Sequence, residues 1–271
     1  VLTLYSRNNR TNDFVNSILT ESDLSILSRL KNENRSYNEE FTVQADYQTP
    51  IGTTQILEFG GKNINRKVNS DYKYFNAVGA NGDYVPTANS NLANIFSYNQ
   101  NITAGYLSYT LALKSGYSLK AGTRYEYTTI NANFATEKRP VVIPSYGVLV
   151  PSINFSKKLT SGGTVKVAYN RRIQRPSIQF LNPNIQASNP YSMSIGNPSL
   201  GPEYTNNYEL SYSTFVKSTS LNFSTFVRNT NNAIQSVRDV IGNVPTDPDT
   251  IRTTYRNIGS ENAYGGSVFA G

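Results

Sequence analysis

The sequence predicts an all-β protein, a transmembrane antiparallel β-barrel with up-and-down strands. Three observations predict it: side chains alternate with a period of two from Glu39 onward, short turns alternate with long loops, and the apolar content is low. Hydrophobic residues make up only 38% of the 271, with 20 tyrosines and 12 phenylalanines. A soluble domain of this length needs a core rich in Leu, Ile and Val, whereas a wide barrel encloses a polar interior.

The composition also excludes several functions. The chain has no cysteine and no histidine, which removes thiolate metal sites, disulfides, the commonest metal ligand and any Ser-His-Asp arrangement. The net charge of +7 is dispersed along the chain, whereas nucleic-acid binding requires basic residues clustered on one face. No stretch approaches 18 consecutive apolar residues, so we expect no transmembrane helix. We expect no enzyme, no cofactor and no nucleic-acid partner.

The first residues, Val1 to Arg7, alternate weakly and are typical of a strand end. The polar stretch Asn8 to Asn38 contains one helix-like patch over Thr20–Lys31. Thr20 and Asp23 fit a capping box, and three leucines follow at helical spacing. They are Leu24, Leu27 and Leu30. We therefore expect one small helix on a loop here.

The run Tyr117–Ile130 alternates most cleanly, after a tight turn at Lys114-Ser115-Gly116. Apolar and aromatic side chains make one face, and Lys120, Arg124 and Glu126 make the other. Three charges on one strand face rarely point into a packed core, because burying unpaired charge is costly. They face either bulk water or the polar lumen of a wide barrel. In the preceding strand the alternation shifts near Gly105, which predicts a bulge there.

The connections favour a barrel. Those near residues 50, 115, 161, 216 and 260 are short, and those near 20, 80, 138, 187 and 245 are long. In an up-and-down sheet this order places every short turn at one end, as in outer-membrane barrels with short periplasmic turns and long extracellular loops. A soluble sandwich mixes loop lengths at both ends. The pattern gives about eleven strands, counting a turn at Gly259–Ala263.

Tyrosines recur near the strand ends. At a bilayer interface the ring lies in the apolar layer while its hydroxyl reaches water, which produces aromatic girdles. High β-propensity alone gives the same enrichment, and the girdle is the favoured interpretation. The tyrosines concerned are Tyr47, Tyr98, Tyr127, Tyr169, Tyr208, Tyr255 and Tyr264.

A loop from Asn170 to Glu203 contains five prolines and lies between two alternating runs. Long loops of this kind are usually functional. Arg171, Arg172 and Arg175 flank it and are the candidate ligand-binding residues, because guanidinium groups suit an anionic ligand or the phosphates of a surface lipid. The alternative, which we favour, is that they pair with Glu203 or with loop carbonyls and hold the loop. Asp247-Pro248-Asp249 supplies only two carboxylates for calcium, so no metal site is predicted.

The run Asn170–Pro176, with Leu181-Asn182-Pro183 and Gly196–Glu203, resembles the "RRIxRP…LNP…GNPxLxPE" run of the TonB-dependent-receptor-like outer membrane β-barrel family. Ala121–Tyr127 and Thr254–Gly259 resemble other strands of that family, and the resemblance covers roughly Glu39 to Gly271. It implies a bacterial outer-membrane protein whose complete barrel has 22 strands and a plugged lumen. It also implies nutrient uptake driven by the TonB system of the inner membrane.

The same resemblance leaves two functions open, a transporting receptor and a non-transporting barrel that acts as a scaffold for a surface lipoprotein or another partner. A soluble tyrosine-rich adhesin is a third. Because the chain begins and ends within strands, residues 1–271 are expected to be part of a barrel, without the plug domain and the C-terminal closing strands. Open strand edges cannot lie in lipid, so we expect this segment alone to aggregate without detergent. The substrate is not predicted.

Overall fold

The computed structural model describes residues 1–271 except 88–93, 135–142, 184–185, 190–191 and 242–249. The described residues form one sheet of thirteen strands and a single short helix. That helix, within the described part of the chain, is not long and apolar enough to cross a membrane.

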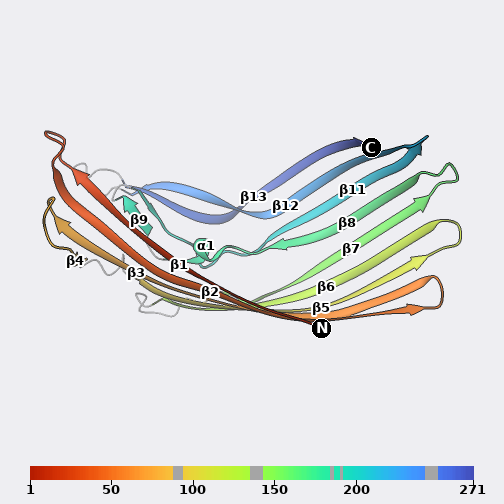
Figure 1. The fold of residues 1–271 in the computed structure, drawn as a ribbon, viewed down its shortest axis with the longest axis horizontal. Coiled ribbons are helices and arrows are strands. Elements are labelled where there is room, and N and C mark those ends of the chain that lie inside the picture. Colours follow the sequence, from red (N-terminus) through yellow and green to blue (C-terminus); the bar gives the residue numbers. More distant parts are fainter. Residues whose placement is uncertain (88–93, 135–142, 184–185, 190–191, 242–249) are drawn as a thin grey trace.

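Ten of the strands are long and follow one another through the sheet in chain order, each antiparallel to the next (Figure 1). They are β1 (Leu2–Leu19), β2 (Ile26–Ile51), β3 (Gln55–Val78), β5 (Asn94–Ala112), β6 (Tyr117–Phe134), β7 (Tyr146–Lys158), β8 (Thr164–Gln174), β11 (Glu203–Val216), β12 (Thr219–Ile241) and β13 (Thr250–Ala270). The short strands are β4 (Val85–Pro86), which pairs with β3, and β9 (Gln186–Asn189) and β10 (Ser192–Ser194), which extend the sheet beyond β13. The up-and-down order confirms the predicted fold class.

The two ends of the sheet differ as predicted. Residues 52–54, 113–116, 159–163 and 217–218 form short turns at one end of the sheet, and the described connections at residues 20–25 and 79–84 lie at the other (Figure 1). Three of the short turns contain a glycine at positive φ, namely Gly52, Gly116 and Gly162. Only glycine adopts this backbone conformation readily, which explains how so few residues reverse the chain.

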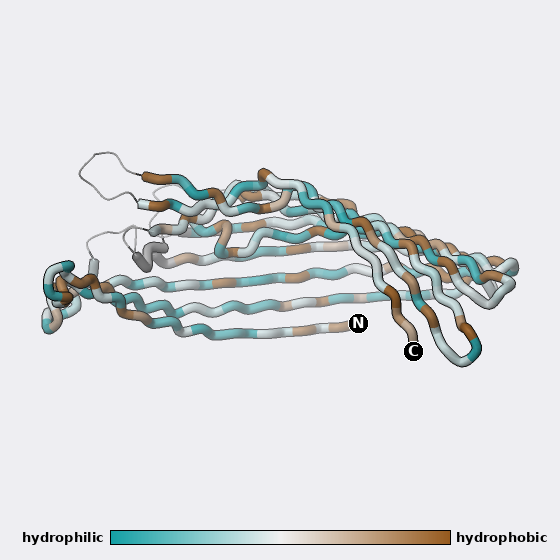
Figure 2. The backbone as a smooth tube through the Cα atoms, turned by 90° about the horizontal axis from the view of Figure 1, so that it is seen from above, coloured by the Kyte–Doolittle hydropathy of each residue, from teal (hydrophilic) through white to brown (hydrophobic). Residues whose placement is uncertain are grey.

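The faces of the sheet also alternate as predicted, and hydrophobic and hydrophilic residues follow one another along the strands in Figure 2. One face carries exposed apolar side chains that meet rung by rung across neighbouring strands. They include Phe59, Leu107, Leu119, Phe155, Val167 and Leu210. The opposite face carries Glu58, Lys120, Arg124 and Glu126. An apolar outer face and a polar inner face are what a membrane barrel requires.

The prediction of a helix over Thr20–Lys31 is wrong. β1 continues to Leu19, residues 20–25 turn, and β2 begins at Ile26 and pairs with β1 along its length. Sheet pairing with both β1 and β3 outweighs the weak helical spacing of three leucines, because helix propensity is easily overridden by tertiary contacts. Thr20 and Asp23 are hydrogen-bonded to each other, but they close a hairpin turn and cap no helix.

Two further local predictions are wrong. The turn expected at Gly259–Ala263 lies inside β13, where the pairing with β12 shows two adjacent register shifts, both within Asn231–Ile234. The bulge expected near Gly105 is absent, since β5 pairs with both β3 and β6 through this residue without a shift. The apparent shift arises because β5 carries apolar side chains on both faces, with Ile102 buried on the inner face and Leu107 and Tyr109 exposed on the outer one.

The connection between β8 and β11 folds back onto the concave face of the sheet. We call residues 175–202 the inner segment; it contains α1 (Ile178–Leu181), which lies between the two halves of the curved sheet in Figure 1. Leu181 and Leu200 are 1% and 4% exposed and pack in one cluster with Phe96, Tyr98 and Ile130 of β5 and β6. The apolar core of this part of the molecule is therefore small, and the inner segment completes it.

The sheet has one incomplete junction. β7 pairs with β8 only from Ser152–Asn170 to Lys158–Thr164. Beyond that point Tyr146–Pro151 of β7 and Arg171–Gln174 of β8 diverge (Figure 1), and we call the gap between them the seam. Pro151 is the first residue of β7 past the pairing, and proline has no N–H to give to a neighbouring strand.

Candidate functional site

The inner face of β6 carries a line of polar side chains at alternate positions, from Lys120 through Arg124 and Glu126 to Thr128. The period of two in the strand places them all on the concave side, and the inner segment lies above them. The candidate site is the polar surface formed where the two meet.

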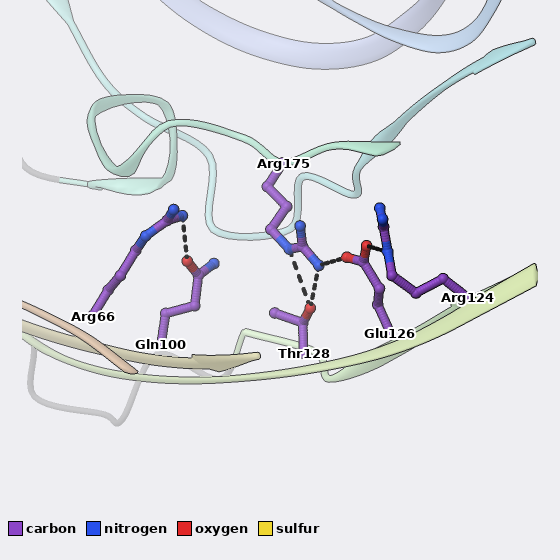
Figure 3. A network of polar contacts seen from close by, with 6 residues as sticks. All are labelled: Arg66, Gln100, Arg124, Glu126, Thr128 and Arg175. Carbon is purple, nitrogen blue, oxygen red and sulfur yellow. Dashed lines mark hydrogen bonds and ion pairs between the residues drawn. The ribbon is translucent and has the colours of Figure 1, made fainter. Parts of the chain in front are cut away.

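Arg175 connects the inner segment to β6 (Figure 3). Its guanidinium forms an ion pair with Glu126, and its Nε and Nη2 donate hydrogen bonds to Thr128 Oγ1 at 3.2 and 3.1 Å. Arg124 Nε donates to the other oxygen of Glu126 at 2.6 Å. The side chains of Arg175 and Glu126 are 17% and 8% exposed, so this ion pair is screened less by solvent than a surface pair.

A second polar network lies beside the first (Figure 3). Arg66 of β3 pairs with Glu40 of β2 at 2.6 Å and donates to Gln100 of β5 at 3.4 Å. Both networks occupy the inner face, where Arg124 and Arg175 share Glu126 and Arg66 pairs with Glu40. The concave surface thus carries both positive and negative side chains, and the ion pairs between them hold these side chains in place.

The far side of the inner segment is bonded to β12 and β13. Asn257 exchanges two hydrogen bonds with Gly201, and Asn197 Nδ2 donates to the Tyr255 carbonyl at 2.9 Å. Asn232 Nδ2 donates to the Pro202 carbonyl at 2.8 Å. The Gly-Asn-Pro and Gly-Pro-Glu runs therefore supply the groups that join the inner segment to one half of the sheet, while Arg175 joins it to the other.

The structure separates the three arginines that the sequence placed together. Arg175 holds the inner segment, in agreement with the structural interpretation, although its partner is Glu126 and not Glu203. The Glu203 carboxylate instead accepts a hydrogen bond from the Ile234 N–H at 2.7 Å. Arg171 lies over the Tyr204 ring at 5.5 Å. Arg172 follows on the opposite face, and a ligand-binding role for the three residues stays a prediction.

Cavities along the inner face are polar. One of about 450 Å³ is lined by Arg172, Arg228, Glu203 and Glu261. Another, of about 360 Å³, lies between the inner segment and β1–β3 and has largely uncharged lining that includes Asn34, Ser70, Tyr72 and Gln179. Such surfaces suit the passage or binding of a hydrophilic solute, because they replace water hydrogen bonds with protein ones.

No cluster of three or more carboxylates placed to hold a metal ion occurs among the residues that the structure describes. The Asp247-Pro248-Asp249 motif lies outside those residues.

The aromatic girdle is present in part. Tyr47, Tyr127, Tyr208 and Tyr264 are exposed on the apolar face, and Tyr169 packs against Tyr208 with ring centroids 5.0 Å apart. The expectation is wrong for two tyrosines. Tyr98 is only 1% exposed and belongs to the inner core, and Tyr255 stacks on Phe180 of the inner segment.

An antiparallel wall with an apolar outer face, a polar inner face and turns sorted by length defines a membrane-spanning β-barrel protein. The model of the outer membrane protein beta-barrel family matches residues 1–271. The chain belongs to this family, which places it in the bacterial outer membrane and confirms the family resemblance of its motifs. No curated protein matches it in sequence.

Solved structures share the fold. The copper transporter OprC superimposes with a TM-score of 0.60 at 10% identity, over 99% of this chain and 40% of its own. The ferric citrate transporter FecA, unliganded, gives 0.56 at 12% identity, over 99% of this chain and 36% of its own. A double mutant of the Serratia marcescens hemophore receptor HasR, in complex with its hemophore HasA and heme, gives 0.52 at 11% identity, over 99% and 56%. The chain thus spans less than two thirds of each.

Proposed function

We propose that this chain is part of the barrel of an outer-membrane receptor of the TonB-dependent type, which takes up a nutrient across the outer membrane. The observation that carries the proposal is the polar, cavity-lined inner face opposite an apolar outer face. A polar inner face with cavities is what a barrel that passes a hydrophilic solute requires. The barrel neighbours named as transporters and receptors support the same function.

In this proposal residues 1–271 are a barrel portion, and a plug domain and the closing strands belong to the full-length protein. The long connections face the cell exterior and capture the ligand, and the plug moves when the TonB system pulls on it. Arg171, Arg172 and Arg175 remain the proposed ligand-binding candidates, with Arg172 in the best position, since it lines the charged cavity. The chemistry is transport, so no catalytic residue is assigned.

The second candidate is a non-transporting barrel that serves as a scaffold in a surface complex. The neighbour HasR was solved in complex with its hemophore HasA, so a barrel of this fold can bind a protein partner. A surface lipoprotein is the partner we propose for that case.

The first measurement is the mass and terminal sequence of the native polypeptide from purified outer membranes. A protein several hundred residues longer, with a plug-like domain before Val1, supports transport. A mature chain that ends near Val1 and Gly271 contradicts the 22-stranded barrel.

Function is then tested by deleting the gene and growing the strain on arrays of limiting carbon, iron and metal sources. Transport predicts a growth defect on a specific nutrient that is reproduced by inactivating TonB. Unchanged growth on every source, together with loss of a partner from outer-membrane complexes, replaces transport by the scaffold function.

A further inference from the structure

Two cavities lie next to each other on the concave face of β1, β2 and β3. The first, of about 360 Å³, is lined by these strands and by α1 of the inner segment. The second, of about 280 Å³, is lined by β1 and β3 and by Ser192–Ser194 of β10. Asn12 and Tyr72 line both, so the cavities adjoin, and we call them together the neutral cavities.

The neutral cavities lie beyond the lipid, on the side of the long connections. Asn34, which lines the first, is 17 residues from Ile51, the end of β2 at the short turn. At about 3.3 Å per residue and a strand tilt of about 45°, Asn34 stands roughly 40 Å above that turn. The hydrocarbon layer is about 30 Å thick. In the orientation usual for outer-membrane barrels, a solute that enters from outside therefore reaches these cavities early.

The lining of the neutral cavities is almost without charge. Among the described residues that line them, Arg10 is the only charged one. The cavity that contains Arg172 differs, because it is lined by two arginines and two glutamates. An ionic solute is attracted by an excess of the opposite charge. The neutral cavities instead select a solute through hydrogen bonds and ring contacts.

Side-chain amides supply the hydrogen-bonding groups. Asn34 is 4% exposed, and its Oδ1 accepts a hydrogen bond from Ser70 Oγ at 3.1 Å, so the protein itself fixes the orientation of this amide. Asn12 of β1 and Gln179 of α1 place two more amides on the first cavity. An amide donates and accepts at once, and a hydroxyl group does the same, so the two pair well.

Aromatic rings line the same space. Tyr72 borders both cavities, and Phe14 and Tyr74 border the second. Asn32 lies between Phe14 and Tyr74 in one rung of the sheet. Its side chain is 0% exposed, and neither atom of its amide has a hydrogen-bond partner among the described residues. Native folds keep few such groups because each is destabilising, so this one marks a place where function has set the residue.

We propose that the neutral cavities bind an uncharged oligosaccharide. Its hydroxyl groups pair with the amides of Asn12, Asn34 and Gln179, and the C–H face of one sugar ring packs on the ring of Tyr72. Two adjoining cavities suit two neighbouring sugar rings. A short peptide fits less well, because its charged amino terminus finds no carboxylate among the described lining residues. The inference rests on the proposed transport function and names the class of nutrient.

The test is isothermal titration calorimetry on the full-length protein, in a non-ionic detergent that has no sugar headgroup. The probes are neutral hexasaccharides of glucose, of xylose and of mannose, an acidic hexasaccharide of galacturonate, and a hexapeptide of alanine. We expect a neutral hexasaccharide to bind with the same affinity at low and high salt, because no ion pair contributes to binding.

Substitutions locate the site. Gln179→Ala removes an exposed amide from α1 and leaves the sheet intact, and Asn34→Ala removes the amide that Ser70 holds. Each should weaken binding about five- to tenfold, the effect of a lost hydrogen bond. Asn38→Ala is the matched control, because Asn38 lies on the same face of β2 and lines neither cavity. It should bind as the wild type does.

The opposing results are distinct. Binding of the galacturonate or the peptide alone, an affinity that falls with salt, or no binding of any neutral hexasaccharide overturns the substrate class. Wild-type affinity in both Gln179→Ala and Asn34→Ala overturns the site.

Failure of this inference is distinguishable from failure of the transport proposal. A TonB-dependent growth defect confined to an iron source, without sugar binding, overturns the inference and leaves transport standing. Sugar binding that weakens in Gln179→Ala, with unchanged growth of the deletion strain on every oligosaccharide, supports the site and contradicts transport.

Discussion

Glu126 is the residue on which the inner polar surface depends most. It accepts from two arginines that come from different parts of the chain, Arg124 on its own strand and Arg175 on the inner segment. Removing one partner of a buried pair leaves the other charge desolvated, which costs more than the pair contributes when intact.

Arg175→Gln is therefore expected to loosen the inner segment by about 2 kcal/mol, a typical value for a hydrogen bond to a charged group. The measurement is hydrogen exchange of the α1 amides in the full-length protein, which should speed up by about thirty-fold if local opening limits exchange. Arg124→Gln is the control, because Arg124 is 48% exposed and bonds the same carboxylate without touching the inner segment. Similar effects of the two substitutions would show that Arg175 is not the connection.

The sequence predicted the faces of this site better than its contacts. The alternation in Tyr117–Ile130 places Lys120, Arg124 and Glu126 on one face, as observed. The pairing of Glu126 with Arg175 was not predictable, because it depends on where a proline-rich loop folds back, 49 residues away in sequence. The adjacent positions of Arg171 and Arg172 suggested one cluster, yet successive side chains of a strand point to opposite faces.

At the scale of elements, the hairpin between β1 and β2 shows how a few polar groups replace the helix that the sequence suggested. The Ser25 N–H lies 3.1 Å from both Thr20 Oγ1 and Asp23 Oδ1, and the hydroxyl of Thr20 bonds the Asp23 carboxylate. Short polar side chains that bond nearby backbone groups favour turns over helices.

These contacts lower the pKa of Asp23 below its usual 3.8, mainly through the Thr20 hydroxyl and then through the Ser25 backbone N–H. Because the folded pKa is depressed, the contribution of Asp23 to the hairpin is present above pH 3.8 and is lost as the pH falls through the lower, folded value. An NMR titration of labelled aspartate in the full-length protein checks this. Thr20→Val should return the Asp23 pKa toward 3.8, and an unshifted wild-type value would contradict the turn geometry.

The long strands were predictable because period-two alternation persists over many residues and is hard to produce otherwise. Their ends were not. β2 and β3 extend far past the alternating apolar part through polar stretches such as Asn32–Asn38, which carry no hydrophobic signal. There the strands are held by pairing with their neighbours and by cross-strand contacts, among them the bond from Ser70 Oγ to Asn34 Oδ1 at 3.1 Å.

For the whole molecule, the fold predicts opposite locations for the two ends of the sheet. Residues 1–271 contain no cysteine, so an introduced one meets no background thiol from this part of the protein, and labelling of the unsubstituted protein is the control. Asn81→Cys, on a long connection, should react with a membrane-impermeant maleimide on intact cells. Ser161→Cys, in a short turn, should react only after the outer membrane is permeabilised. The reverse pattern would invert the orientation of the barrel.

The strands also differ in how far they rise. β2 has 26 residues, roughly 85 Å at about 3.3 Å per residue, against a hydrocarbon layer of about 30 Å. Even with strand tilt, the ends of β2 and β3 near the long connections, and the part of β1 paired with them, project beyond the lipid. This projecting part of the strands carries ion pairs, such as Arg35 with Asp13 and Lys73 with Asp71. We therefore expect an antibody or a bacteriophage that binds the described part of the chain to contact these projecting strands, as well as the loops that connect them.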